Sequence, residues 1–209
     1  YSGKYSLDGL PSLFSNPDEK ADTLEIELAD KATGVRVTLL YGVFEDKDVI
    51  TRAVIVKNGG NDKIKLRRIM SCNLDFRRVG FDFIHFYGHA YLERLTEREH
   101  VTHAACEIGS VKGTPGHEHN PSVVLCDRNA NEDYGECYGA ALLYTGNFIC
   151  NAKVDQLNQT RFVMGIHPEK FEFVLNADDT FTAPEVVLTY SDSGFAKMTH
   201  HLHDVFREN

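Results

Sequence analysis

The chain has 209 residues, of which 42% are hydrophobic and 25% charged, and its formal net charge is −9. These proportions are typical of a soluble globular protein, and the length suits one large domain or two small ones. An acidic chain lacks the basic face that nucleic acid requires, and no apolar run reaches the roughly 18 residues of a membrane-spanning helix. We therefore predict neither a nucleic-acid partner nor a membrane partner.

The first residue and the cysteines indicate what kind of protein the chain comes from and in which compartment it lies. Tyr1 stands where Met would begin a complete product, and no charged and apolar leader follows it, so we interpret the chain as an excerpt from a longer protein. None of the five cysteines belongs to a C-x-x-C motif, which predicts buried, inert thiols in a reducing compartment. The cysteines are Cys72, Cys106, Cys126, Cys137 and Cys150. We expect a cytoplasmic protein.

Period-two alternation of apolar and polar residues dominates the pattern. Leu24, Ile26 and Leu28 alternate with two glutamates, and similar alternation follows in residues 35–43, 64–76, 171–175 and 186–190. Residues of one parity share a face of a strand, so each segment should have one buried side. Turn signals lie between them, in residues 29–34, 57–62 and 176–179. About ten short strands with this spacing predict an all-β, antiparallel sandwich.

Residues 107–133 interrupt this pattern. The segment is poor in alternation and rich in Gly, Pro, His and Asn. We predict a long loop there, and loops of that length in compact domains usually have a function, such as covering an interface.

The last residues carry a pattern of another kind. Phe195, Met198, Leu202, Val205 and Phe206 lie at helical spacing. Residues 191–193 offer side chains for an N-cap, so we predict a helix that begins near Ser193. Its apolar stripe should be buried on the sandwich or on a domain outside this chain.

Several groups of residues could in principle carry chemistry. His117 and His119 could chelate a metal from one strand face, but no third ligand has a standard spacing, which favours a hydrogen-bonding role. Cys106 has no orienting group for a nucleophile, and no pair of the 31 acidic residues is marked as a glycosidase pair. The residues alone therefore indicate a β-sandwich with a functional loop and no visible active site.

Taken together, several segments resemble the N-terminal domain of α-galactosidases of glycoside hydrolase family 36. They are residues 23–30, 41–52, 71–76, 117–121, 134–148, 165–168 and 184–191, followed by the predicted helix. Their order covers nearly the whole chain. The sequence departs from the family at His89 and Phe173, where relatives often carry Trp, and in residues 113–116, where relatives are Ser-rich.

The resemblance implies a large twisted sandwich of the galactose mutarotase type, called a supersandwich, that precedes a (β/α)₈ catalytic barrel. It implies hydrolysis of terminal α-galactosyl residues from raffinose- or melibiose-type sugars by a retaining mechanism, with no cofactor. The two catalytic aspartates belong to barrel motifs that are absent here, so we expect no catalytic residue and no metal site in this chain.

The expected organisation follows from the same resemblance. Residues 1–192 should form the sandwich, lacking its first part, and residues 193–209 a helix that leads toward the barrel. The expected partners are this barrel, an α-galactoside oligosaccharide and further copies of the chain. The candidate interface residues are His117, His119, Asn120, Phe195, Met198 and Leu202. Two alternatives stay open, a stand-alone carbohydrate-binding module and a mutarotase-like isomerase that uses a His with a Glu on a concave sheet.

Overall fold

The protein is almost entirely built of β-strands. A computed structural model describes residues 1–209. Besides the short 3₁₀-helix η1 (Glu45–Lys47), it contains one helix, α1 (Gly194–Glu208), at the C-terminal end. The strands are β1 (Ala21–Ala29), β2 (Val35–Phe44), β3 (Val49–Asn58), β4 (Ile64–Leu66), β5 (Met70–Phe76), β6 (Phe81–His89), β7 (Leu92–His100), β8 (Cys106–Ser110), β9 (His119–Asp127), β10 (Cys137–Leu142), β11 (Phe148–Val154), β12 (Thr160–Ile166), β13 (Phe173–Leu175), β14 (Thr180–Thr182) and β15 (Val186–Ser191).

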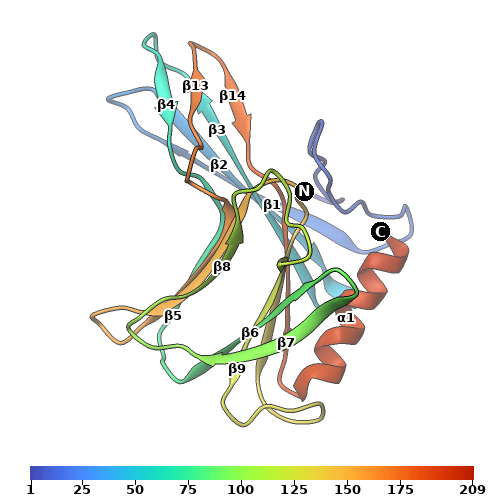
Figure 1. The fold of residues 1–209 in the computed structure, drawn as a ribbon. Coiled ribbons are helices and arrows are strands. Elements are labelled where there is room, and N and C mark those ends of the chain that lie inside the picture. Colours follow the sequence, from blue (N-terminus) through green and yellow to red (C-terminus); the bar gives the residue numbers. More distant parts are fainter.

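The strands form two facing sheets and a third sheet of only two strands. The larger sheet has nine strands in the order β1-β2-β3-β15-β10-β9-β6-β7, with β14 paired to β3. The second sheet has four strands in the order β5-β12-β11-β8, and β4 pairs with β13. All pairings between named strands are antiparallel, which confirms the predicted all-β sandwich with a C-terminal helix. Figure 1 shows the large sheet curving past the smaller one.

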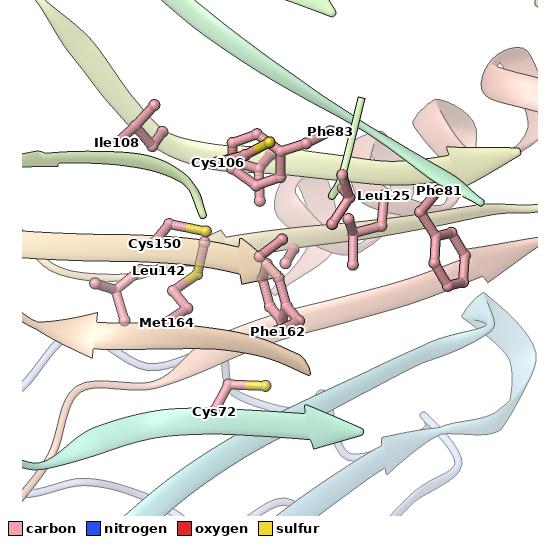
Figure 2. Packing of buried hydrophobic residues seen from close by; sticks show 14 of the residues in the cluster. Cys72, Phe81, Phe83, Cys106, Ile108, Leu125, Leu142, Cys150, Phe162 and Met164 are labelled. Carbon is pink, nitrogen blue, oxygen red and sulfur yellow. The ribbon is translucent and has the colours of Figure 1, made fainter. Parts of the chain in front are cut away.

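The main core lies between the two sheets. Seventeen buried residues form it, and the large sheet contributes Phe81 and Phe83 from β6 while the small sheet contributes Phe162 and Met164 from β12. Their side chains fill the space between the layers (Figure 2). Alternate residues of each strand point to this space because successive strand side chains face opposite sides.

The central strand β9 is buried on both faces. Val123 and Leu125 belong to the core between the sheets, whereas Val124 and Cys126 pack with α1 residues on the other side. A strand covered on both sides has a continuous apolar run instead of alternation. For this reason the prediction of one long loop over residues 107–133 is wrong. Only residues 111–118 and 128–133 of that segment lie outside strands.

Helix α1 covers the outer face of the large sheet. Met198 and Val205 are buried there, in two clusters with residues of β9, β10 and β15 among others. The helix begins directly after Ser193, as predicted. The predicted side-chain cap is absent, because the Ser193 hydroxyl donates to Asp192 instead. Backbone carbonyls of the β9–β10 loop accept the first helical N–H groups.

Glycine is required where the helix meets that loop. Gly194 has a φ of +79°, and a Cβ there would lie 2.5 Å from the carbonyl oxygen of Asn131. Asn131 accepts from the N–H of Phe195 at 2.9 Å, so the close approach is what satisfies the helix N-terminus.

The apolar row of β1 is exposed, contrary to the expectation of one buried side. Leu24, Ile26 and Leu28 are 54%, 38% and 53% exposed. β1 is the edge strand of the large sheet, and the four-stranded sheet lies elsewhere on that face. The alternation therefore predicted the strand β1 correctly, but its prediction that the apolar side chains of this strand are buried was wrong.

The cysteines are free and buried, which confirms the predicted inert thiols. Burial raises the pKa of Cys72 to about 11 and that of Cys126 to about 12, so both remain protonated near neutral pH. As for membranes, none of the helices combines the length and the apolar character that a crossing requires.

The core can be tested with a phenylalanine pair. Phe162→Ala removes a ring that is 2% exposed, and Phe173→Ala removes one that is 42% exposed. We expect the first to lower the free energy of unfolding by about 3–5 kcal/mol and the second by less than about 1 kcal/mol. Urea unfolding followed by circular dichroism measures both, and equal losses would contradict the assigned core.

Candidate functional site

The loop between β8 and β9, residues 111–118, is tied to the neighbouring turn. The Ser110 hydroxyl donates to the carbonyl of Thr114 at 2.6 Å. The Gly113 N–H donates to Asn147 Oδ1 at 2.6 Å, and Lys112 forms an ion pair with Glu118. These contacts hold the loop that presents His117.

His117 and His119 have different partners. His117 is exposed, and its Nδ1 lies 2.8 Å from Glu93 Oε1 on β7. His119 begins β9, and its ring centroid lies 5.8 Å from that of His85 on β6. Asn120 follows on β9 and is half-buried. The structure thus brings the predicted loop residues against the β6–β7 hairpin, and their use as an interface stays a prediction.

His85 and two glutamates complete a polar cluster that the sequence analysis did not find. His85 Nε2 lies 3.0 Å from Glu99 Oε1 and 3.8 Å from Glu97 Oε2. His85 shares its sheet face with Phe83, which lies in the core between the sheets. The signal was visible as a histidine in the alternating series Phe81, Phe83, His85.

The cluster is electrostatically unusual. Burial, and then the neighbouring His85, lower the pKa of His119. The Nδ1 atoms of His85 and His119 are buried without hydrogen-bond partners. The ring of His119 therefore stays neutral at pH 7 and suits hydrogen bonding more than charge pairing.

No group of three or more His, Cys, Asp or Glu side chains has an arrangement that could hold a metal ion. In particular, His117 and His119, the chelating pair considered from the sequence, face different neighbours.

The candidate residues of α1 contact the chain's own sheet. Met198 is 5% exposed and packs with Ile84, Val124 and Cys137. Phe195 packs at the edge of this cluster, with the guanidinium carbon of Arg98 6.0 Å from its ring centroid. Leu202 packs on the second cluster under the helix, near Val187. The apolar stripe of α1 is therefore buried on the sandwich, which was one of the two predicted possibilities. A further contact of α1 with another domain stays a prediction.

The sequence of this chain is similar to a known protein family and to several characterised proteins. The Glycosyl hydrolase family 36 N-terminal domain matches residues 1–176. The bifunctional alpha-galactosidase/sucrose kinase AgaSK of Mediterraneibacter gnavus is 42% identical over 208 residues, which are 100% of this chain and 22% of AgaSK. Alpha-galactosidase AgaA of Geobacillus stearothermophilus is 38% identical over 207 residues, which are 99% of this chain and 28% of AgaA.

Solved structures agree with the sequence matches. The galactosidase domain of AgaSK has a TM-score of 0.95 at 43% identity, over 99% of this chain and 28% of that one. A variant of AgaA in complex with raffinose has a TM-score of 0.97 at 38% identity, over 99% of this chain and 29% of that one. The relatives are thus glycosyl hydrolases that contain this sandwich as one part.

The chain belongs to the N-terminal domain family of glycosyl hydrolase family 36, because the family match covers most of its length and the fold is the same. The chain spans between about a fifth and 28% of the length of these curated relatives.

The lowered pKa of His119 predicts a pH effect. The unfolded ring binds a proton near pH 6.5 while the folded ring resists protonation, so the stability present above pH 6.5 falls as the pH drops below it. We expect His119→Asn to reduce the loss of stability between pH 7 and pH 5. Urea midpoints measure this, with His103→Asn, at an exposed position, as the control. Equal losses in the wild type and His119→Asn would contradict the burial of this ring.

The packing of α1 predicts a second effect. Leu202→Asp places a carboxylate against the cluster around Val187, and we expect it to lower the free energy of unfolding by about 2–3 kcal/mol. His203→Asp introduces the same carboxylate at an exposed position of the same helix. Thermal unfolding distinguishes them, and an unchanged melting temperature in Leu202→Asp would mean that the helix does not depend on this contact.

Proposed function

We propose that this chain is a non-catalytic domain of a cytoplasmic α-galactosidase, which hydrolyses terminal α-galactosyl residues of raffinose- or melibiose-type sugars by a retaining mechanism. The observation that carries the proposal is the match of nearly the whole chain to one part of longer α-galactosidases. A (β/α)₈ barrel in the longer polypeptide supplies the nucleophile and the acid, and the sandwich supports this barrel and the assembly of several copies.

The state of Glu185 supports a non-catalytic role. A glycosidase acid needs a raised pKa and access to the sugar. Burial raises the pKa of Glu185, but its side chain is 0% exposed and its oxygens accept from Lys4 Nζ at 2.7 Å and from the Leu13 N–H at 3.0 Å. The side chain of Glu185 therefore has no route to substrate, although burial raises its pKa.

The mutarotase-like alternative has one observation in its favour, the His85–Glu99 contact on the face that opposes the second sheet. The side chain of His85 is only 4% exposed, so its ring does not reach a sugar in this conformation. An assay of anomer interconversion by the 209-residue chain tests this alternative, and we expect the uncatalysed rate.

The activity assay for the main proposal compares the 209-residue chain with the full-length protein on a chromogenic α-galactoside. We expect turnover by the full-length protein alone, because a retaining mechanism needs both carboxyl groups. The non-catalytic role would be contradicted if the 209-residue chain hydrolysed the substrate and replacement of one of its own acidic residues abolished this hydrolysis. An inactive full-length protein would contradict the α-galactosidase assignment.

A further inference from the structure

Two of the five buried cysteines face each other across neighbouring strands. Cys126 on β9 and Cys137 on β10 are directly opposite each other in the antiparallel register, and both are 0% exposed. Directly opposite residues point to the same face of a sheet, which here is the outer face under α1. The other three cysteines belong to the core between the two sheets, so the large sheet separates them from this pair.

The backbone spacing of the pair suits a disulfide. The N–H of Asp127 donates to the Glu136 carbonyl at 3.0 Å, so the next pair along the two strands is hydrogen-bonded and the cysteines form a non-hydrogen-bonded pair. The Cα atoms of such a pair are about 4.5 Å apart, within the range of roughly 4.4–6.8 Å found in disulfides. The Cβ atoms, at about 4.5 Å, lie at the upper end of the disulfide range. An S–S bond therefore needs no rearrangement of the two strands.

The remaining cysteines have no partner at this spacing. Cys106 is opposite Ala152 and diagonal to Cys150, and diagonal neighbours lie roughly 7–8 Å apart. Cys72 and Cys150 are opposite Met164 from its two sides, which separates them by two strand spacings, or about 9.6 Å. Both separations exceed the reach of a disulfide. The pair under α1 is therefore the one that an oxidant can join.

The two cysteines lie at the ends of the loop from which α1 starts. The loop carbonyls of Asn131, Glu132 and Gly135 accept the N–H groups of residues 194–196, the first of the helix. Met198 of α1 packs in the same buried cluster as the two thiols. A bond between the ends of this loop would restrain the loop and, through it, the start of the helix.

The docked helix keeps the thiols unreactive. Burial raises the pKa of Cys126 to about 12 and that of Cys137 to about 11, although the charge of Arg98 acts in the opposite direction on both. The thiolate is the form that reacts with oxidants, so little of it is present while α1 covers the pair. Local opening of α1 admits water and oxidant, and Arg98, whose Nη1 donates to the loop carbonyl of Ala130, stays beside the thiols.

We propose that Cys126 and Cys137 form a reversible disulfide when the protein meets hydrogen peroxide, and that opening of α1 controls the rate. The first thiolate attacks one peroxide oxygen, the O–O bond breaks, and the products are a sulfenic acid and water. The second sulfur displaces the sulfenic oxygen as water, which takes the thiol proton, and the S–S bond forms. The cysteines lose two electrons and the peroxide gains them. A dithiol reductant reverses the reaction and is itself oxidised.

Peptide mass spectrometry of the full-length protein tests this site. The protein is treated with hydrogen peroxide, its free thiols are blocked in denaturant, and it is digested with trypsin. Cleavage after Arg128 separates the two cysteines, so the disulfide joins the peptides of residues 113–128 and 129–153. We expect this linkage, with the bond placed on Cys137 by fragmentation, and its loss after dithiothreitol. No linkage, a bond to Cys150, or only singly oxidised thiols would overturn the proposal.

Substitutions test which residues are needed. Cys126→Ser should abolish the linkage, whereas Cys150→Ser, a matched change at a buried thiol of the same tryptic peptide as Cys137, should preserve it. Loss of the linkage in both variants would overturn the assigned pair. Leu202→Asp weakens the docking of α1 and should speed disulfide formation by about tenfold or more, while His203→Asp should leave the rate unchanged. Equal rates in Leu202→Asp and the wild type would overturn control by the helix.

A measurement on the unaltered protein does not depend on the folding of any variant. Hydrogen exchange in peptides of α1 is compared between the peroxide-treated protein and the same sample after reduction. We expect the disulfide to slow exchange at the start of the helix by about tenfold, because the loop that accepts its first N–H groups is restrained. Equal exchange in the two forms would overturn the link between the cysteine pair and α1. The result is independent of the proposed hydrolysis, since the pair lies within this chain.

Discussion

Burial of the central strands on both faces is the interaction on which the rest of this structure depends. β9 and β10 meet the four-stranded sheet on one side and α1 on the other. Each large apolar side chain buried in this way contributes about 1.5–3 kcal/mol. The helix therefore belongs to the sandwich as its third layer. Arg98 holds the β9–β10 loop, whose carbonyls accept the first N–H groups of α1. It donates to Asp82 at 2.6 Å and to the carbonyls of Asp127, Arg128 and Ala130.

A second constraint joins the N-terminal segment to the same sheet. Lys4 and Glu185 form an ion pair with both side chains 0% exposed. A buried pair of this kind contributes little net stability, but loss of one partner leaves an unpaired buried charge that costs about 3–5 kcal/mol. The pair therefore specifies where residues 1–13 lie. Together with α1, this pair covers the outer face of the large sheet.

The sequence predicted the architecture better than the surfaces. Period-two alternation correctly indicated strands such as β1 and β2, and helical spacing located α1 to within a residue. Alternation did not reveal that Leu24, Ile26 and Leu28 are exposed, because it distinguishes the two sides of a strand but does not show which layer covers them.

Strand β9 was not predicted, because a strand that is buried on both faces has no polar side. His85, Glu97 and Glu99 converge through strand pairing, which sequence separation does not show. The family resemblance, carried by residues such as 41–52 and 184–191, supplied the proposed function, which no motif indicated.

The central claim is that the catalytic carboxylates lie outside residues 1–209. A retaining mechanism passes through a covalent glycosyl-enzyme intermediate, so a slow-reacting activated fluorogalactoside labels the nucleophile. The most direct measurement is to label the full-length protein with such a reagent and to locate the modified residue by peptide mass spectrometry. The account predicts one modified carboxylate beyond this domain and no modified peptide within it. A label on any acidic residue between Tyr1 and Asn209 would contradict it.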